Sequence, residues 1–252
     1  MLLQGRTAIV TGAGRGIGGA IARKLASEGA TVILSARSDR DIQSVATEIE
    51  HAGGHAKAVA GDVSQQADCE KIVRAATDSF GHVDILVNNA GILGPVAPAE
   101  ATTPQQWAEV IAINLTGAFL MSRLVLPGMY ERKSGAILNV TSVAGKMAYQ
   151  FNSAYASSKA GLMGLTRTLA AEGARNGVRV NGISPGPVGD TDMWQALAKR
   201  LGEASSHVLS MILQGRPRTT DEIAAAAVFL VSDQASGITG QILNVDGGMA
   251  FY

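Results

Sequence analysis

The sequence of 252 residues predicts one α/β domain, a doubly wound parallel sheet of about seven strands with helices on both faces. Short β-rich runs alternate with longer helical patterns along the whole chain. Runs such as Val32–Leu34 and Ile85–Val87 are continuously apolar, as strands covered on both faces are. No linker rich in proline, serine or charge interrupts the alternation, so residues 1–252 are expected to form a single domain.

Each predicted strand except the last is followed by a helical stretch. The first strand, 7–11, is followed by a glycine cluster and by a helix over 17–27 whose apolar residues recur every four positions. Thr103 and Pro104 predict the start of a long helical region, because threonine caps helices and proline suits the first helical position. The other expected strands are 31–35, 56–60, 84–87, 136–140, 178–183 and 241–245, and the other expected helices are 40–52, 65–80, 153–176 and 221–231.

The composition narrows the class of protein. Apolar residues make up 46% of the chain and charged residues 17%, which provides a buried core and excludes a disordered chain. The 21 basic residues equal the 21 acidic ones, so the chain lacks the basic excess of a general nucleic-acid binder. The single cysteine, Cys69, cannot form an intramolecular disulfide, which is typical of a reducing compartment.

No segment is predicted to cross a membrane. The longest clear apolar run, 223–231, is far shorter than the roughly 20 residues that a membrane helix needs. The first residues show no basic region followed by an apolar stretch, so no signal peptide is expected. Histidines and cysteine form no cluster with metal-ligand spacing, so no catalytic metal is expected. These features favour a cytoplasmic protein without a membrane or nucleic-acid partner.

The glycine cluster after the first strand predicts a phosphate site. Gly14, Gly16 and Gly19 fit the spacing G-x-G-x-x-G, whereas Gly12, Gly16 and Gly18 fit G-x-x-x-G-x-G. The second spacing is preferred because Gly12 would occupy the turn itself. Missing side chains let a pyrophosphate approach the backbone, and the N-terminus of the following helix favours negative charge. The alternative is a tight turn in a glycine-rich protein, which the strand before it and the helix after it disfavour.

Two arginines favour NADP(H) as the dinucleotide. An NAD site usually carries Asp or Glu at the end of the second strand, where it binds the ribose 2′-hydroxyl. Here Arg37 follows that strand, and Arg15 lies inside the glycine cluster. Two guanidinium groups suit a 2′-phosphate, which they can hold through paired hydrogen bonds. The alternative is that both are solvated surface arginines, and NAD(H) then remains possible.

A tyrosine and a lysine four residues apart predict a proton-transfer site. In a helix, Tyr155 and Lys159 would lie on one face, one turn apart. A nearby ammonium favours the phenolate, so the pKa of Tyr155 is expected to fall below its usual value near 10. Such a pair alone is usually structural. Ser142, however, follows the strand 136–140 at the edge where doubly wound sheets bind ligands, and Asn114 lies in the long helical region.

These motifs together resemble the short-chain dehydrogenase/reductase family, especially its members like 3-oxoacyl-[acyl-carrier-protein] reductase. The resemblance covers nearly the whole chain, from Thr11 to Gly248, and implies a Rossmann-like fold. Besides the glycine cluster, it is carried by Asp62-Val63, Asn88-Asn89-Ala90-Gly91, Asn114, Ser142, Tyr155, Lys159, Pro185-Gly186 and Val245-Asp246-Gly247-Gly248.

The resemblance implies a role for each catalytic residue. Tyr155 would be the general acid in carbonyl reduction and the base in alcohol oxidation. Ser142 would hydrogen-bond the substrate oxygen as charge develops there. Lys159 would hold the nicotinamide ribose and tune Tyr155, and Asn114 would anchor a water that connects Lys159 to solvent.

The resemblance also implies a set of cofactor contacts. Asp62 and Val63 would contact the adenine, and Val188 and Thr191 would meet the carboxamide. Family members usually carry a threonine a few residues after Pro-Gly, whereas here Gly189 and Asp190 intervene before Thr191. The full expected set is Gly12, Gly14, Arg15, Gly16, Ile17, Gly18, Arg37, Asp62, Val63, Asn88, Ala90, Gly91, Tyr155, Lys159, Pro185, Gly186, Val188 and Thr191.

The expected function is NADP(H)-dependent hydride transfer between nicotinamide and a small secondary alcohol or ketone. The alternatives are an NAD-dependent sugar or polyol dehydrogenase and a non-catalytic dinucleotide-binding sensor. An epimerase or dehydratase would be expected to carry a larger C-terminal region. The resemblance implies a homotetramer or homodimer, and a substrate lid over 187–217 in which Met193 and Trp194 either pack or face the substrate.

Overall fold

The computed structural model describes residues 1–252 and contains the predicted seven-stranded sheet. All neighbouring strands are parallel, in the order β3-β2-β1-β4-β5-β6-β7. The order reverses between β1 and β4, and ligands bind at the carboxyl ends of strands beside such a reversal. The strands are β1 (Thr7–Thr11), β2 (Thr31–Ser35), β3 (His55–Ala58), β4 (Ile85–Asn88), β5 (Gly135–Val140), β6 (Val178–Pro185) and β7 (Ile242–Val245).

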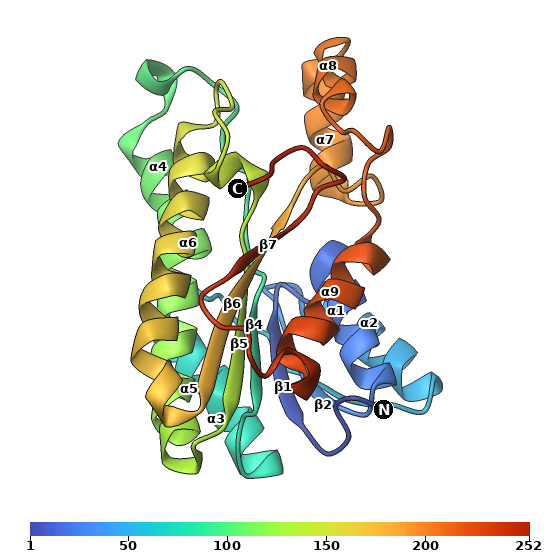
Figure 1. Cartoon of the computed structure of the whole chain (residues 1–252), viewed down its shortest axis with the longest axis vertical. Coiled ribbons are helices and arrows are strands. Elements are labelled where there is room, and N and C mark those ends of the chain that lie inside the picture. Colours follow the sequence, from blue (N-terminus) through green and yellow to red (C-terminus); the bar gives the residue numbers. More distant parts are fainter.

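Helices cover both faces of this sheet, as predicted (Figure 1). One layer is formed by α1 (Gly16–Ser27), α2 (Asp39–His51) and α9 (Thr220–Val231). The other layer is formed by α3 (Gln66–Phe80), α4 (Pro104–Ile111), α5 (Gly117–Arg132) and α6 (Ser153–Gly173). Two further helices, α7 (Asp192–Leu201) and α8 (Ala204–Ser210), lie outside these layers beyond the carboxyl edge of the sheet.

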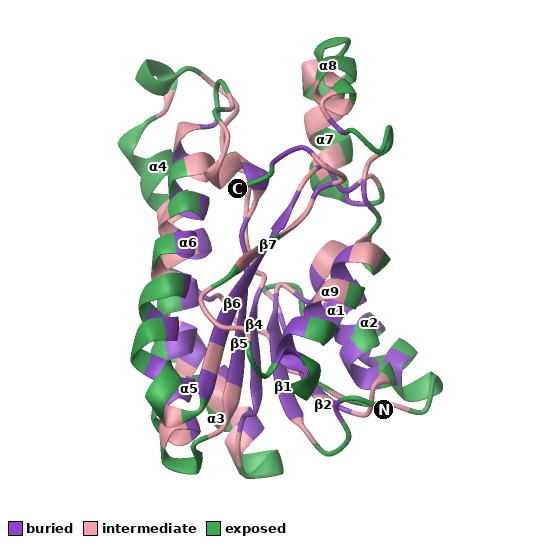
Figure 2. Ribbon diagram, in the orientation of Figure 1, coloured by how far each residue is buried: buried purple, intermediate pink, exposed green.

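The continuous apolar strands are explained by a core on each side of the sheet. Val10 and Leu34 belong to the core that α1, α2 and α9 complete. Their chain neighbours Ile9 and Ile33 point to the opposite face and belong to the core with α3, α5 and α6. The strands at the centre of the sheet are therefore buried on both faces (Figure 2).

The long helical region contains a feature that sequence reasoning missed. A π-helical turn, Ala112–Thr116, separates α4 from α5. The whole stretch Pro104–Arg132 is long and apolar enough to cross a membrane, so the prediction that no segment reaches this length was wrong. Polar residues interrupt its apolar runs, so no single run is long. The mean hydropathy of the most apolar window of the stretch nevertheless stays as high as that of a membrane-spanning helix. Half of its most apolar window is buried, and Met121 and Met129 belong to the core. Its apolar residues thus serve the interior of the protein.

Residues 187–217, between β6 and α9, lie outside the sheet and its two helix layers. Neither α7 nor α8 contains a buried residue, and both stand away from the sheet (Figures 1 and 2). The two ends of the segment are joined, because Val188 and Arg218 form a parallel bridge. Residues 187–217, called the excursion below, are therefore an exposed segment whose two ends are held together.

Candidate active site

The glycine cluster forms the turn between β1 and α1. Gly12 has a positive φ of 64°, and a Cβ built on it would lie 2.8 Å from the Ala90 Cα. A Cβ on Gly18 would overlap the Gly12 carbonyl oxygen and the Asn89 side chain. A larger residue cannot enter either position without opening the turn. The glycines thus let the turn pack closely on Asn89 and Ala90, and at the start of α1 the N–H groups without helical partners favour an anion.

Asn89, which the sequence analysis placed in a motif without giving it a role, holds this turn in place. Its side-chain amide donates to the carbonyl oxygens of Thr11 at 2.9 Å and Gly12 at 3.1 Å. The Thr11 hydroxyl in turn accepts from the backbone N–H groups of Asn89 and Ala90, each at 3.1 Å. The position of Asn89, directly after an apolar strand at the ligand edge, was the available signal.

Asn88 is directed elsewhere. Its side chain donates to Asn139 Oδ1 at 2.9 Å, to Ser122 Oγ at 3.1 Å and to the Ala118 carbonyl at 3.4 Å. These bonds tie β4 to β5 and α5 beneath the site. Gly91 is the neighbour that lines the catalytic region, because a Cβ there would lie 3.5 Å from Lys159 Nζ. The Asn88 amide N–H groups are thus used inside the fold, and the expected contact of Asn88 with a cofactor stays a prediction.

The two arginines that favour a 2′-phosphate lie at the same edge of the sheet. Arg37 is exposed and immediately precedes Ser38, which caps α2. A Cβ on Gly14 would lie 2.8 Å from the Cβ of Asp41, so the glycine turn touches the first turn of α2. Arg15 precedes α1, and its guanidinium pairs with Asp192 at 3.0 Å. Arg15 is therefore engaged by the excursion rather than free.

The residues expected at the adenine lie on the loop after β3. The Asp62 carboxylate accepts from the Ser64 N–H at 2.9 Å and from the Ser64 hydroxyl at 2.8 Å. Val63 is 6% exposed and lies against Gly117, the first residue of α5. Ile17, the second residue of α1, is partly buried against the core. Asp62 thus stabilises its own turn, and Val63 connects that turn to the helix layer.

Tyr155 and Lys159 lie one turn apart on α6, as predicted. The Lys159 ammonium lies 5.7 Å from the centroid of the Tyr155 ring and donates to the Val140 carbonyl at 2.7 Å. Lys159 is only 4% exposed. Burial disfavours the charged amine and lowers the pKa of Lys159 to about 8.

The pKa of Tyr155 differs from the expectation. Burial of the phenol raises it above its ordinary value, and a hydrogen bond with Ser142 lowers it in part. The expected fall was wrong for the protein alone, because desolvation of the buried phenol is the larger effect and no lowering by the Lys159 ammonium offsets it. The same hydrogen bond brings the Ser142 side chain to the phenol.

Asn114 lies in the π-helical turn and bonds to two other parts of the chain. Its Oδ1 accepts from the Ile92 N–H at 2.8 Å, and its Nδ2 donates to the Ile92 carbonyl at 2.9 Å and to Ser158 Oγ at 3.0 Å. Ser158 precedes Lys159 on α6, and a Cβ on Gly91 would lie 3.3 Å from Asn114 Oδ1. The structure therefore brings Asn114, Gly91 and Lys159 together.

The loop after β6 closes the other side of the site. Pro185 ends β6, and Gly186 lies so near Asp246 that an added Cβ would approach its Cα to 3.1 Å. Val188 is 4% exposed. The Thr191 hydroxyl donates to the Val188 carbonyl at 2.8 Å and accepts from the Trp194 N–H, so Thr191 caps α7. Trp194 and Met193 both lie in the first turn of α7.

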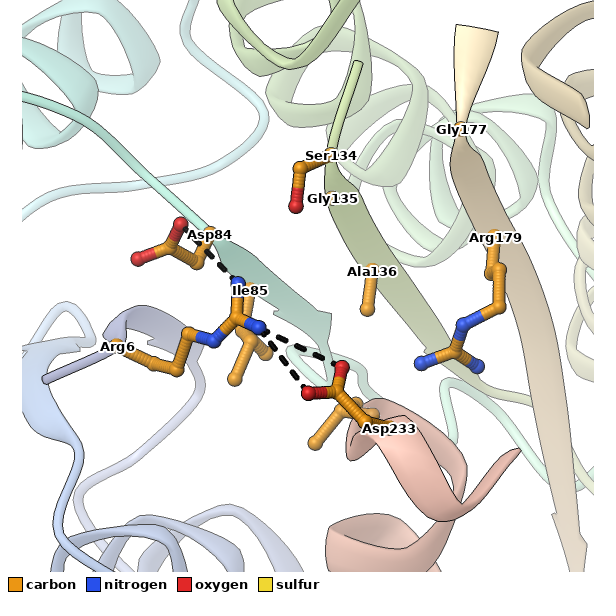
Figure 3. Close-up of a pocket in the computed structure, with 10 residues that line it drawn as sticks. Arg6, Asp84, Ile85, Ser134, Gly135, Ala136, Gly177, Arg179 and Asp233 are labelled. Atoms are coloured by element: carbon orange, nitrogen blue, oxygen red, sulfur yellow. Dashed lines mark hydrogen bonds and ion pairs between the residues drawn. The ribbon is translucent and has the colours of Figure 1, made fainter. Parts of the chain in front are cut away.

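A separate hollow of about 70 Å³ lies at the opposite, amino edge of the sheet (Figure 3). There Arg6 pairs with Asp84 at 3.8 Å and with Asp233 at 3.3 Å. Arg179 donates to the carbonyl oxygens of Leu230 and Ser232 at the end of α9. The bonds around this hollow thus connect the ends of helices and strands, on the side of the sheet away from Tyr155.

The fold and the residues at the carboxyl edge of the sheet define a dinucleotide-binding α/β enzyme with a tyrosine–lysine pair. A family model described as Enoyl-(Acyl carrier protein) reductase matches residues 12–250. The chain belongs to the short-chain dehydrogenase/reductase family. Its sequence is 41% identical over 249 residues to the 3-oxoacyl-[acyl-carrier-protein] reductase FabG of Vibrio cholerae, covering 99% of both chains.

Two further relatives extend the comparison. The 3beta-hydroxysteroid dehydrogenase 1 of Eggerthella lenta is 41% identical over 252 residues, covering 99% of this chain and 95% of the relative. The crystal structure of an actinorhodin polyketide ketoreductase variant with NADPH has a TM-score of 0.93 at 35% identity and covers 98% of both chains. The chain is therefore an NAD(P)(H)-dependent oxidoreductase that acts on alcohol or ketone groups.

Proposed function

We propose that this protein uses NADP(H) to interconvert a small ketone and its secondary alcohol, with Tyr155 as the general acid and base. The observation that carries the proposal is the meeting of Tyr155, Lys159 and Ser142 at the carboxyl edge of the sheet, beside the glycine turn. The glycine turn fits a dinucleotide, since its missing Cβ atoms let it pack closely on Asn89 and Ala90, and N–H groups without helical partners at the start of α1 suit a pyrophosphate.

The chemistry divides between the cofactor and the side chains. Nicotinamide, when bound, supplies or accepts the hydride. Ser142 donates a hydrogen bond to the substrate oxygen, which stabilises the negative charge that develops there during reduction. Tyr155 gives its phenolic proton to the same oxygen. The positive charge of Lys159 stabilises the phenolate that remains, and Asn114 holds the part of α6 that carries both residues.

The remaining residues of the expected set would bind the cofactor. The glycine turn, with Gly12, Gly14, Gly16, Ile17 and Gly18, would receive the pyrophosphate. Asp62 and Val63 would meet the adenine, and Ala90 and Gly91 the central cleft. Pro185, Gly186, Val188 and Thr191 would lie along the nicotinamide. For Asn88, the proposal assigns a supporting role beneath the site, because its amide already donates within the fold.

NADP(H) is preferred over NAD(H) because of charge. Arg15 and Arg37 flank the contact between the glycine turn and α2, and no carboxylate follows β2 directly. Guanidinium groups there attract a 2′-phosphate and gain little from a 2′-hydroxyl. The polyketide ketoreductase that shares this fold was solved with NADPH, which agrees with the assignment.

The wider setting of the enzyme is part of the same proposal. We place it in the cytoplasm, with residues 1–252 forming one domain, and assembled as a homotetramer or homodimer. Residues 187–217 would act as its substrate lid, because α7 and α8 are exposed and border the nicotinamide side of the site. Its substrate would be a small molecule with a ketone or secondary alcohol, as named for the 3-oxoacyl and 3beta-hydroxysteroid relatives.

The test is a matrix of turnover measurements. NADPH, NADH, NADP⁺ and NAD⁺ would each be combined with acyl thioesters, cyclic ketones, sugars and polyols. We expect turnover of a ketone or its alcohol, and a higher kcat/KM with the phosphorylated cofactors. The variant Arg37→Asp should weaken NADPH far more than NADH. Equal losses for both cofactors would overturn the NADP(H) assignment, and tight NADPH binding without turnover of any compound would favour a sensor.

A further inference from the structure

The proposed cofactor site contains an ion pair that links it to the excursion. Arg15 Nη1 lies 3.0 Å from Asp192 Oδ2. Arg15 lies in the glycine turn, and Asp192 is the first residue of α7. The adjacent residues also approach each other, because a Cβ on Gly16 would lie 3.6 Å from the Thr191 methyl group. The start of α7 is thus held against the glycine turn.

The segment before Asp192 is anchored to the body of the protein. The Asp190 carboxylate accepts from the Thr220 N–H at 3.0 Å and from the Thr220 hydroxyl at 2.7 Å. The Gly189 N–H donates to the Arg218 carbonyl at 2.9 Å. Thr191 bonds back to Val188 at 2.8 Å and caps α7. These bonds limit the movement of the backbone at Asp192, so its carboxylate stays within reach of Arg15.

A 2′-phosphate and the Asp192 carboxylate would compete for the same guanidinium. A phosphate monoester carries about −1.5 to −2 charges at pH 7 and pairs with guanidinium through two parallel hydrogen bonds. If it takes Arg15, Asp192 loses its partner and faces a second anion. The 2′-hydroxyl of NAD(H) needs no guanidinium, so its binding can leave the ion pair intact. Only the phosphorylated cofactor therefore meets this opposition.

We infer that Asp192 is a specificity-determining residue for the cofactor, since it competes with the 2′-phosphate for Arg15 and lowers the preference for NADP(H) over NAD(H). The inference rests on the proposed function, in which Arg15 receives that phosphate. The effect should be modest because both side chains are exposed, Arg15 at 75% and Asp192 at 68%. Exposed ion pairs of this kind change an equilibrium by about 1.5- to 5-fold.

The test measures binding of two nucleotide fragments by calorimetry, which does not depend on activity. Adenosine 2′,5′-bisphosphate carries the discriminating phosphate, and adenosine 5′-monophosphate lacks it. We expect Asp192→Asn to tighten binding of the bisphosphate by about 1.5- to 5-fold and to leave the monophosphate unchanged. The gain should shrink at high salt, because added ions screen exposed charges.

Two further variants make the interpretation specific. Glu203→Gln removes an exposed charge from the same excursion, next to α8, and should leave both affinities unchanged. In an Arg15→Gln background, Asp192→Asn should lose most of its effect, since the contested group is gone. If Asp192→Asn still tightens bisphosphate binding in the Arg15→Gln background, competition for Arg15 is excluded. It is also excluded if Asp192→Asn in the parent changes the affinities for both nucleotides equally, or changes neither.

Variants of the two arginines separate this inference from the proposed function. If the single variants Arg15→Gln and Arg37→Gln, each with Asp192 retained, bind the bisphosphate as tightly as the parent enzyme does, the NADP(H) assignment itself is wrong. If they weaken it and Asp192→Asn does nothing, only the role of Asp192 is wrong. Asp192→Ser supplies a second uncharged side chain at the start of α7, so loss of helix structure in one variant does not decide the result.

Discussion

Lys159 on α6 donates a hydrogen bond to the carbonyl of Val140, the last residue of β5, at 2.7 Å. Ser142 follows two residues later, so this single bond fixes the helix that carries the tyrosine–lysine pair to the strand that presents the serine. The contact between strand and helix therefore helps to hold Tyr155 near Ser142, which caps the short turn after β5. The chemistry of the site thus depends on how α6 packs against the end of β5, and mutations can test this dependence.

The first prediction concerns the phenol. Tyr155→Phe should reduce kcat/KM by roughly 10²- to 10⁴-fold, because the proton donor is removed and the ring is retained. Binding of the adenosine fragments should be unaffected, which calorimetry would show. Tyr130→Phe, on α5 and away from the site, is the matched control and should retain full activity. Parent-like turnover by the Tyr155 variant would rule out its role as the general acid.

The second prediction uses the pKa of Lys159. Its value of about 8 lies below that of lysine in an unfolded chain, about 10.4, so between these pH values the unfolded state binds more protons. The free energy of unfolding should therefore rise with pH across this window. Lys159→Met should remove that slope and stabilise the protein at pH 7 by up to about 3 kcal/mol, less the lost bond to Val140, while turnover falls.

Denaturant unfolding of the parent and the Lys159 variant at both ends of this pH window would measure the effect. Lys71→Met is the matched control, because Lys71 also donates to a backbone carbonyl, that of Ala60, but is more accessible to solvent. It should shift stability by no more than about 0.5 kcal/mol and leave the pH slope intact. A Lys159 variant that keeps the slope of the parent would show that burial of the amine is not its cause.

The third prediction concerns the glycine turn. Gly18→Ala should weaken cofactor binding at least roughly tenfold, because the new Cβ overlaps the Gly12 carbonyl and forces the turn to open. Gly164→Ala, on α6, is the control: a Cβ there meets nothing within 4 Å, so it should stabilise the helix by up to about 1 kcal/mol without affecting cofactor binding. Unchanged affinity in the Gly18 variant would contradict the assignment of the turn.

The fourth prediction separates two adjacent asparagines. Asn88→Ala removes bonds to Asn139 and Ser122 inside the protein and should destabilise it by about 1–3 kcal/mol with little change in cofactor affinity. Asn89→Ala releases the glycine turn and should mainly raise the dissociation constant of the cofactor. Thermal unfolding and calorimetry on both variants would test this division. The reverse pattern would place Asn88 in the cofactor cleft after all.

Much of the fold could be predicted from local pattern. The strand of 31–35 was predicted at the bounds that β2 has, because a run of apolar residues between turn residues specifies a buried strand. The π-helical turn at Ala112–Thr116 could not be predicted, since nothing in the local sequence separates it from an α-helix. It is fixed by Asn114, whose partners Ile92 and Ser158 come from other parts of the chain.

The helices α7 and α8 were not predicted either. They lie in the segment that departs from the alternation of strands and helices, and neither buries a residue against the sheet. No strand separates α8 from α7, so the alternation that marks most helices of the two layers is missing there. Their place beyond the carboxyl edge is decided by the bridge between Val188 and Arg218, which joins residues far apart in the chain.

By itself, the sequence determined the order of strands and helices, the place of the glycine turn and the residue types available at the carboxyl edge. Those features depend on local backbone preference and on apolar periodicity, which are written into neighbouring residues. Only the tertiary structure decided that burial raises the pKa of Tyr155, that Asn88 points into the protein while Asn89 holds the turn, and that Arg15 pairs with Asp192. Each of these depends on which distant segments meet, and desolvation and pairing act through space rather than along the chain.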